Sequence, residues 1–376
     1  MALDHSTTTH KLGRATMQER LFILAVCLIG GGLCSSANSV HLDSKDWPCP
    51  PPNDILPCVC FTDADHRLEM DCSAVTDNAE LARVFATHFT FTDYDTLFIT
   101  PATPPAGLTA LEYSVFGEVS FRHVNISNTK IRTVEDGVFD RSYLTLETLV
   151  LADNEIRSFP FYSIQYFKIL RALHLEYNEI RVFDDIWSDS LEVLSLAGNQ
   201  GLSISSTAFI SATELKELYL YDSQIRNIPT NIFRELESVR VIVLGYNDFQ
   251  GRLKRNFVNP RRSPLERLLL NNNGITGIES DSITGLKLSG QVDFRYNLIE
   301  ELQQTYWWDL LSQVNGVDVI DLRDNPLVCG CDVFWLVLDR VSMNKIHKET
   351  KCISGFRLHD LPESIFNDHC TYPLIQ

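Results

Sequence analysis

The segment Leu146-Glu-Thr-Leu149-Val-Leu151-Ala-Asp-Asn154-Glu-Ile156 recurs, with conservative replacements, along most of this chain. Its spacing is Leu-x-x-Leu-x-Leu-x-x-Asn-x-Leu, and the copies that begin at Leu170 and Leu265 are almost as regular. We call the position of Asn154 the ladder position; in nine copies it is occupied by Thr129, Asn154, Asn178, Asn199, Ser223, Asn247, Asn273, Asn297 and Asn325. Successive ladder positions are 21 to 28 residues apart. A unit this short cannot bury its own apolar face, so the copies must stack into one continuous core.

This pattern and its period are the signature of a leucine-rich repeat. They predict an α/β solenoid, a horseshoe of about 9–10 repeats that includes a degenerate copy near Leu97 and Ile99. Each repeat would add one short strand to a parallel concave sheet, with alternate side chains pointing inward. The amide of a ladder asparagine would satisfy backbone groups that the turn after the strand leaves inside, whereas Thr129 and Ser223 could do so only in part.

A second column of large apolar residues follows ten residues after the ladder position and should fill the convex side of the core: Phe139, Ile164, Phe209, Phe233, Phe257, Ile283 and Trp307. In the shortest repeat this position is Ser188, and we expect the neighbouring Trp187 to replace it. One helix is expected over residues 77–91, where apolar residues have helical spacing. Another is expected over residues 332–341, whose apolar residues would cover the open end of the solenoid.

The beginning of the chain predicts secretion. An apolar run from Leu21 to Leu33 follows several basic residues and precedes small residues that end at Ala37. This arrangement predicts a signal peptide over residues 1–37, with Met1 or Met17 as the start; an uncleaved signal anchor is the alternative. No later apolar run is long enough to span a membrane, and no lipid-anchor signal follows. The protein is therefore expected to be secreted and extracellular, with an N-terminal cap over 38–93, repeats over 94–327 and a C-terminal cap over 328–376.

Eight cysteines lie outside the predicted signal peptide, in two clusters that flank the repeats: Cys49, Cys58, Cys60 and Cys72, then Cys329, Cys331, Cys352 and Cys370. In an oxidising compartment such clusters predict disulfides, which would staple the caps on the exposed ends of the solenoid. A structural zinc site is the alternative for each cluster. Neighbours in a Cys-x-Cys pair are poorly placed to join each other, which leaves two pairings in each cluster.

The cap sequences carry a family resemblance. Asn325-Pro-Leu-Val-Cys329-Gly-Cys331, followed by Trp335, Cys352 and Cys370, resembles the C-terminal flanking cap of extracellular leucine-rich repeat proteins. The first cluster resembles their N-terminal cap, with a wider first gap. The resemblance implies four disulfides, Cys49–Cys60, Cys58–Cys72, Cys329–Cys352 and Cys331–Cys370. The sequence from Trp47 to Val75 is similar to that of secreted, non-catalytic luciferase subunits. This resemblance implies a chain that accompanies a separate catalytic partner.

The sequence carries no signature of catalysis. It contains no nucleophile elbow, zinc-protease motif, phosphate-binding loop or dinucleotide fingerprint. His123 and His174 fall at outward strand positions, but no nucleophile accompanies them, and surface histidine is the simpler interpretation. We therefore predict that the protein is not an enzyme and that it binds no cofactor and no metal ion. An oxygenase subunit with its own activity is the alternative from another functional class.

The outward strand positions predict the binding surface. In the middle repeats they are largely apolar, although a sheet face left to water would carry more charge; the candidate residues are Val150, His174, Val193, Tyr219, Tyr221, Val241, Val243 and Leu269. Contiguous exposed apolar surface indicates an interface. Tyr219 and Tyr221 suit its anchors because tyrosine combines a large apolar area with a polar tip. The alternative is that valine and tyrosine occur here for β-propensity alone.

Two further features concern the partners. Asn125-Ile-Ser127 is an N-glycosylation sequon at an outward strand position, and a glycan on Asn125 would push a partner toward the later repeats. The basic loop Arg252–Arg262 could hold an anionic glycan or an acidic partner, could be cleaved, or could be a solvated loop. The net charge of −17 disfavours nucleic acid and anionic membranes as partners.

These features predict a secreted, non-catalytic scaffold that binds or stabilises another extracellular protein through its concave face. The alternative is an extracellular recognition or adhesion protein that binds an immune or cell-surface ligand and has no enzyme partner.

Overall fold

The computed structural model describes residues 47–262 and 265–370. The predicted signal peptide, residues 1–37, and the choice between Met1 and Met17 lie outside the described residues.

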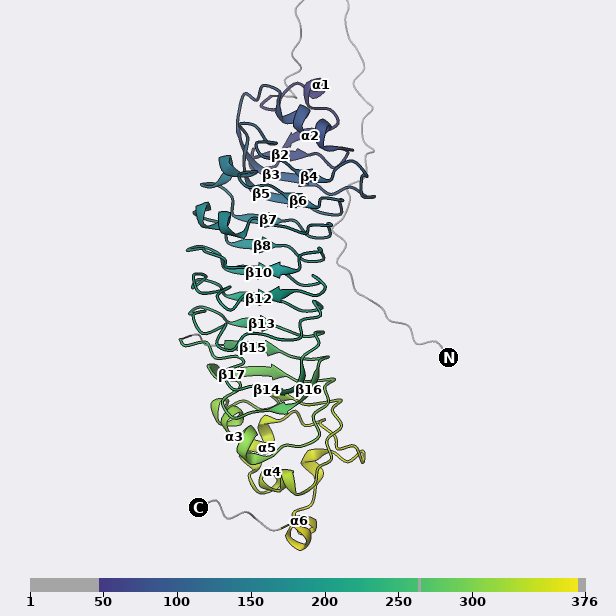
Figure 1. Cartoon of the computed structure of the whole chain (residues 1–376), viewed down its shortest axis with the longest axis vertical. Coiled ribbons are helices and arrows are strands. Elements are labelled where there is room, and N and C mark those ends of the chain that lie inside the picture. Colours follow the sequence, from purple (N-terminus) through teal and green to yellow (C-terminus); the bar gives the residue numbers. More distant parts are fainter. Residues whose placement is uncertain (1–46, 263–264, 371–376) are drawn as a thin grey trace, which may run out of the picture. The chain divides into compact units, whose positions relative to one another are not determined.

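A 12-stranded sheet passes through the described repeats and receives one strand from each of them (Figure 1). Its first two strands form an antiparallel hairpin, and the later neighbours are parallel. In spatial order the strands are β1 (Val59–Thr62), β2 (Leu68–Asp71), β3 (Asp93–Ile99), β5 (Ser120–Ile126), β7 (Thr148–Val150), β8 (Ala172–His174), β10 (Val193–Ser195), β12 (Glu217–Tyr219), β13 (Val241–Val243), β15 (Leu265–Leu269), β17 (Leu286–Asp293) and β18 (Ile320–Asp321). Because this order follows the chain, each repeat lies on the one before it, and the predicted leucine-rich repeat solenoid is confirmed.

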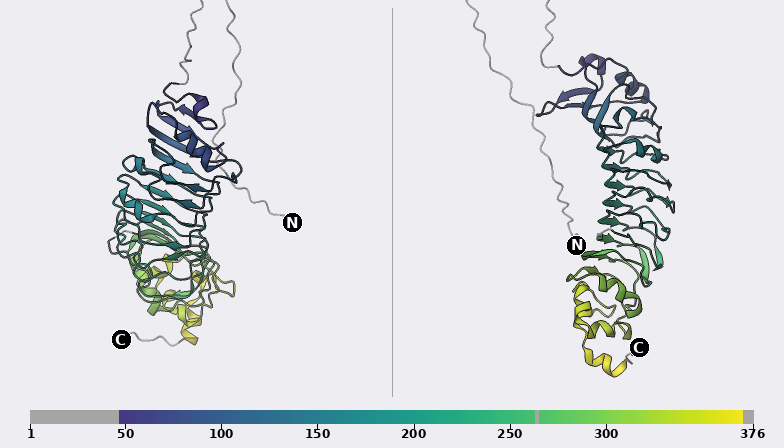
Figure 2. Two further views of the ribbon diagram at one scale, coloured as in Figure 1. Left: turned by 45° about the horizontal axis from the view of Figure 1, so that its top comes forward. Right: turned by 90° about the vertical axis from the view of Figure 1, so that its left-hand side faces the viewer.

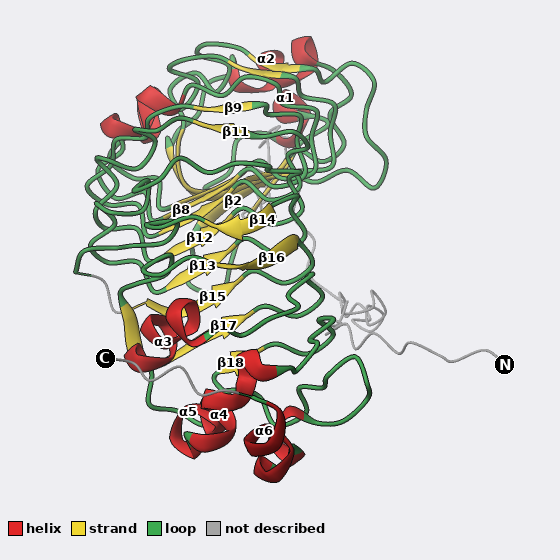
Figure 3. Cartoon of the chain, turned by 60° about the horizontal axis from the view of Figure 1, so that its bottom comes forward, coloured by secondary structure: helices red, strands yellow, loops and turns green. Residues whose placement is uncertain are grey.

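The stack bends toward the side that carries this sheet (Figure 2), and we call that side the concave face. Short strands form three separate two-stranded sheets, paired as β4 (Ala110–Leu111) with β6 (Thr133–Val134), β9 (Val182–Phe183) with β11 (Ser203–Ile204), and β14 (Gln250–Leu253) with β16 (Gly274–Ile278). Figure 3 shows β9 and β11 apart from the 12-stranded sheet. Helical segments lie in some of the connections between successive strands of the 12-stranded sheet: η1 (Asp140–Ser142), η2 (Phe161–Tyr166) and α3 (Gln304–Gln313).

The apolar positions of the repeat form the core. Leu146, Leu149 and Leu151 are completely buried, and so are Leu97 and Ile99 of the degenerate copy on β3. The second apolar column is buried in the seven repeats where it was predicted. The expectation for Trp187 is wrong: its side chain is 54% exposed, and the completely buried Ile186 fills the core instead. The hydroxyl of Ser188 accepts a hydrogen bond from the backbone N–H of Leu191 at 3.0 Å, so Ser188 shapes a turn at the position that apolar residues fill elsewhere.

The N-terminal cap contains α1 (Pro52–Ile55) and α2 (Asn78–Phe85). Helix α2 begins after Asp77, whose carboxylate accepts a hydrogen bond from the N–H of Glu80 at 2.8 Å. It ends earlier than the predicted residue 91. The hydroxyl of Thr87 donates a hydrogen bond to the carbonyl of Val84 at 2.8 Å, and such a local side-chain bond competes with continuation of the helix.

The C-terminal cap departs further from prediction. The single helix expected over 332–341 is divided into η3 (Cys331–Val333), α4 (Phe334–Leu338) and α5 (Arg340–Lys345), and η4 (Leu358–Asp360) and α6 (Glu363–His369) follow. The division falls at Asp339, which leaves helical geometry and caps α5 by accepting from the N–H of Val341 at 3.1 Å. Phe334, Leu336 and Val337 still cover the open end of the core.

Both caps contain disulfides. The structure pairs Cys49 with Cys60, Cys58 with Cys72, Cys329 with Cys352 and Cys331 with Cys370, which are the pairs that the resemblance implies.

Candidate functional site

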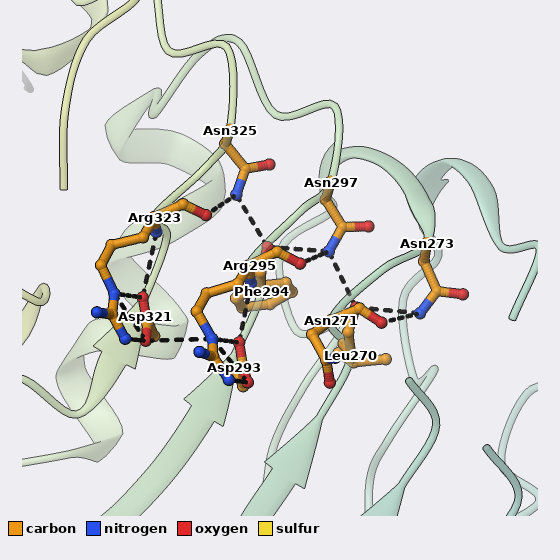
Figure 4. A network of polar contacts seen from close by, with 10 residues as sticks. All are labelled: Leu270, Asn271, Asn273, Asp293, Phe294, Arg295, Asn297, Asp321, Arg323 and Asn325. Carbon is orange, nitrogen blue, oxygen red and sulfur yellow. Dashed lines mark hydrogen bonds and ion pairs between the residues drawn. The ribbon is translucent and has the colours of Figure 1, made fainter. Parts of the chain in front are cut away.

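The ladder residues hold the strand ends in register and so position the concave face. The Nδ2 of Asn178 donates to the carbonyl of Leu151 in the preceding repeat at 2.8 Å, and its Oδ1 accepts from the N–H of Ile156 at 2.9 Å. Asn273, Asn297 and Asn325 repeat this arrangement farther along the stack (Figure 4). Asn178 Nδ2 also donates to the carbonyl of Leu175 in its own repeat at 3.0 Å, so the amide satisfies backbone groups of two repeats at once.

Ser223 meets this requirement differently. Its hydroxyl donates to the carbonyls of Tyr221 at 3.0 Å and of Leu196 at 3.3 Å. It has no amide oxygen, and its own backbone carbonyl accepts from the N–H of Gly201 at 2.9 Å. The backbone therefore replaces one of the two functions that the asparagine side chain has elsewhere.

The strand register brings the predicted binding residues to one face. Val150, His174, Tyr219, Val243 and Leu269 lie on one row across neighbouring strands, with Ser195 between His174 and Tyr219. Val193 and Val241 lie on the next row, on either side of Glu217, and Tyr221 follows Tyr219 on the same face. We call these eight residues the concave patch: Val150, His174, Val193, Tyr219, Tyr221, Val241, Val243 and Leu269. All are partly buried, and Ser195 and Glu217 interrupt their apolar surface.

The two tyrosines of the concave patch are partly buried, and both have polar neighbours within the chain. The hydroxyl of Tyr219 donates to Glu217 Oε2 at 2.6 Å, and burial together with this bond raises the pKa of Tyr219 to about 12. Burial and a hydrogen bond with Tyr177 raise the pKa of Tyr221 to about 12 as well. Both rings are therefore neutral at physiological pH and positioned before any partner arrives, which reduces the entropy lost on binding.

A hydrogen-bonded pair, His174 and Glu176, lies beside the tyrosines. His174 Nδ1 is 3.2 Å from Glu176 Oε1. Burial disfavours ionisation of Glu176, but the hydrogen bonds from His174 and from the backbone outweigh it and lower the pKa of this carboxyl. The middle of the concave face therefore carries negative charge as well as apolar area.

The apolar row ends at Leu269, and a row of ion pairs begins on the next strand (Figure 4). Arg295 contacts Asp293 at 2.7 Å on β17, and Arg323 contacts Asp321 at 2.7 Å next to β18. Arg295 Nε also lies 3.5 Å from Asp321 Oδ2, which links the two pairs. Since each guanidinium is matched by a carboxylate, this end of the face is polar but has no excess charge.

The sequon lies where the sequence predicts it. Asn125 is on β5 and pairs in register with Val150 of the concave patch. Its Oδ1 accepts from the hydroxyl of Ser127 at 2.6 Å. A glycan on Asn125 would therefore crowd the first strand of the patch.

The basic loop Arg252–Arg262 is largely neutralised by the protein itself. Lys254 contacts Glu279 at 2.8 Å, and Arg255 contacts Asp281 at 2.5 Å. The guanidinium of Arg252 lies 4.6 Å from the ring centre of Tyr306. These contacts leave less positive charge for an anionic glycan than the sequence suggests.

Sequence reasoning missed a row of tyrosines at the edge of the concave face. Tyr177, Tyr246 and Tyr296 directly precede ladder residues, have φ values of 54°, 55° and 56°, and are exposed. The residue before the ladder is otherwise Asn, Asp or Gly, the types that adopt this left-handed geometry most readily. A bulky tyrosine at such a position is rare, and this irregularity in the column was the available signal.

The described residues contain no helix that is long and apolar enough to cross a membrane. Within the same residues, no group of three or more His, Cys, Asp or Glu side chains could hold a metal ion.

Comparison with known proteins agrees with the architecture. A family model described as "Leucine rich repeat" matches residues 189–249. The chain is 30% identical over 327 residues to "Oplophorus-luciferin 2-monooxygenase non-catalytic subunit" of Oplophorus gracilirostris, which covers 86% of this chain and 88% of that protein. It is 24% identical to osteomodulin of Rattus norvegicus, over 52% of this chain and 48% of the relative, so it spans only about half of that protein.

Two solved structures share the fold. One is the Toll–Spatzle complex of Drosophila, with a TM-score of 0.55 and 18% identity, covering 72% of this chain and 41% of the other. The second is a chain in the octameric complex of Latrophilin 3, Unc5D and FLRT2, with a TM-score of 0.55 and 19% identity, covering 81% of this chain and 97% of the other. At these identities the likeness concerns the fold alone.

Proposed function

Because the chain belongs to the leucine-rich repeat family, together with the non-catalytic subunit of Oplophorus-luciferin 2-monooxygenase, we propose that it is a secreted, non-catalytic scaffold that binds another extracellular protein through the concave patch.

The observation that carries this proposal is the fixed pair Tyr219 and Tyr221 at the centre of the patch. Interface hot spots are enriched in tyrosine and lie near the centre of the contact area. Here the hydroxyl of Tyr219 is hydrogen-bonded within the chain and both rings are partly buried, so they can contact a partner with little further ordering. Val243 pairs with Tyr219, and Val193 and Val241 lie on the next row, on either side of Glu217, so these valines would help to exclude water from the contact.

The absence of catalysis is part of the proposal. The similar protein of Oplophorus gracilirostris is described as a non-catalytic subunit, and by that likeness the present chain would support a partner that carries out the chemistry. Secretion is supported by the disulfides of the two caps, because disulfides form and persist mainly in oxidising compartments.

Affinity capture from the host's extracellular fluid, with the secreted protein as bait, tests this function. We expect the double variant Tyr219→Ala with Tyr221→Ala to lose the captured protein while keeping its fold, as judged by circular dichroism and thermal unfolding. Each hot-spot truncation typically costs at least about 2 kcal/mol of binding. Tyr296→Ala is the matched control, because this exposed tyrosine lies beyond the patch.

Normal capture by the double variant would refute the concave patch as the binding site. Capture of a cell-surface or immune ligand, with no enzyme among the bound proteins, would favour recognition or adhesion over the role of an accompanying subunit. Turnover by the purified chain alone would contradict a non-catalytic role.

A further inference from the structure

A second surface with binding character lies away from the concave patch. Side chains from the end of β6, from the segments after β9 and β11, and from the segment 158–165, which overlaps η2, line an open cleft of about 870 Å³. This volume is within the range of about 300–1,000 Å³ that is typical of ligand sites. The aromatic wall includes Tyr162 and Trp187, which are 53% and 54% exposed. Trp187 therefore contributes little to the core, and its exposure needs another explanation.

Three carboxylates line the same cleft: Asp136, Asp184 and Asp185. Asp136 accepts a hydrogen bond from the hydroxyl of Ser163, and Asp185 accepts one from Thr207 Oγ1 at 2.5 Å. Asp184 is exposed at the rim. Bonds from Ser163 and Tyr162 lower the pKa of the Asp136 carboxyl, so it is ionised at physiological pH.

The charge of this cleft is not balanced by its own lining, which contains no lysine and no arginine. Other acidic groups in the repeats that line the cleft are paired: Glu155 contacts Arg132 at 2.9 Å and Glu179 contacts Arg157 at 2.8 Å. The cleft carboxylates make no such pair among the described residues. An aromatic wall with unmatched negative charge is complementary to a cation that also has an apolar stem.

We propose that this cleft is a second protein-binding site, which receives a lysine or arginine side chain from a basic segment of a partner. The cation would lie over the ring of Trp187, the aromatic side chain that binds cations best, and contact Asp184 at the rim. Arg252 and Tyr306 show that this chain already uses such a contact internally, with 4.6 Å between the guanidinium and the ring centre.

This site is independent of the proposed function. Its lining comes from η2 and the residues just before it and from the segments next to β6, β9 and β11, and it includes no residue of the concave patch; β9 and β11 lie apart from the 12-stranded sheet (Figure 3). A partner on the concave patch and a basic segment in the cleft could therefore be bound together, and each site can be removed without the other.

A fluorescein-labelled peptide of four arginines, titrated with the secreted protein at physiological salt and followed by fluorescence anisotropy, tests the proposal. We expect Trp187→Ala and Asp184→Asn each to weaken binding by about threefold to tenfold. Trp187→Phe, which keeps a ring, should lose less than Trp187→Ala. Asp324→Asn is the matched control, because it removes one exposed negative charge outside the cleft.

Equal weakening by Asp324→Asn and Asp184→Asn would overturn the proposal, since it would show a general attraction to a chain of net charge −17. Unchanged binding by Trp187→Ala would overturn it too. Tetramethylammonium is the second probe: displacement of the peptide at submillimolar concentration would identify a site for small cations instead of a peptide. The double variant Tyr219→Ala with Tyr221→Ala should bind the peptide like the wild type, so failure of one site is separable from failure of the other.

Discussion

The ring of Tyr177 lies against the backbone of Gly198, where an added Cβ would come within 2.3 Å of Tyr177 Cδ1. Gly198 also has a φ of 71°, which other residues adopt at a cost of about 1–2 kcal/mol. Gly198→Ala should therefore destabilise the protein in two ways, through its backbone and by displacing Tyr177. Gly201→Ala is the control, because Gly201 has a φ of 77° but no atom within 4 Å of an added Cβ.

The measurement is the shift in the urea unfolding midpoint at constant slope. We expect Gly198→Ala to shift it further than Gly201→Ala. Equal shifts would mean that the contact between Tyr177 and Gly198 adjusts without cost.

The ladder gives a second prediction. Asn178→Ala should destabilise the protein more than Ser223→Ala, because the amide of Asn178 bonds backbone groups in two repeats while the carbonyl of Ser223 remains after substitution. A buried group left unpaired costs about 1–3 kcal/mol. Thermal unfolding of the two variants under identical conditions provides the comparison. Equal shifts in melting temperature would show that a ladder asparagine contributes no more to stability than a ladder serine.

The differences between sequence and structure have local causes. Periodicity predicts the inward leucines and the ladder, because both are dictated by a repeat that must bury its face against its neighbours. Trp187 was assigned to the core because a missing apolar residue seemed to require a large substitute, whereas Ile186 is sufficient. Helix 332–341 was predicted from apolar content, which does not show that Asp339 would divide it by capping a second helix.

The candidate site shows the same limit. Alternation along each strand correctly brings the eight residues of the concave patch to one face. It cannot predict that neighbours leave them only partly exposed, or that Tyr219 is bound to Glu217. The cleft around Trp187 depends on loops from several repeats, and no spacing rule relates those loops.

The caps provide a third prediction. In the protein purified without reductant, the eight cap cysteines should resist alkylation until a reductant is added, and no zinc should be released when they react. Replacing Cys331 and Cys370 by serine opens the C-terminal cap and should cost about 2–5 kcal/mol of stability. Mass spectrometry before and after reduction counts the thiols. Alkylation without reductant, or bound zinc, would contradict the disulfide caps.

The fourth prediction concerns acid. The pKa of Glu176 is lowered in the folded protein, so the unfolded chain takes up this proton first as the pH falls. The stability that ionised Glu176 contributes is present above its ordinary pKa of 4.5 and is lost as the pH falls through the lower folded value. Glu176→Gln should therefore flatten the loss of stability between pH about 5 and about 3. Urea unfolding at several pH values measures this, with the exposed Glu214→Gln as control; an unchanged pH profile would refute the role of Glu176.

The fifth prediction compares the concave patch with the basic loop Arg252–Arg262 as the site that binds the partner. Lys254 and Arg255 are already paired with Glu279 and Asp281, so replacing them together with Arg252 by glutamine should change stability by only about 0–1 kcal/mol per pair. For partner binding we expect a change in association rate and salt dependence, with little change in the amount captured at equilibrium. Surface plasmon resonance at two salt concentrations separates these effects. If this triple variant loses the partner while Tyr219→Ala with Tyr221→Ala retains it, the partner binds the basic loop and the concave patch is not the site.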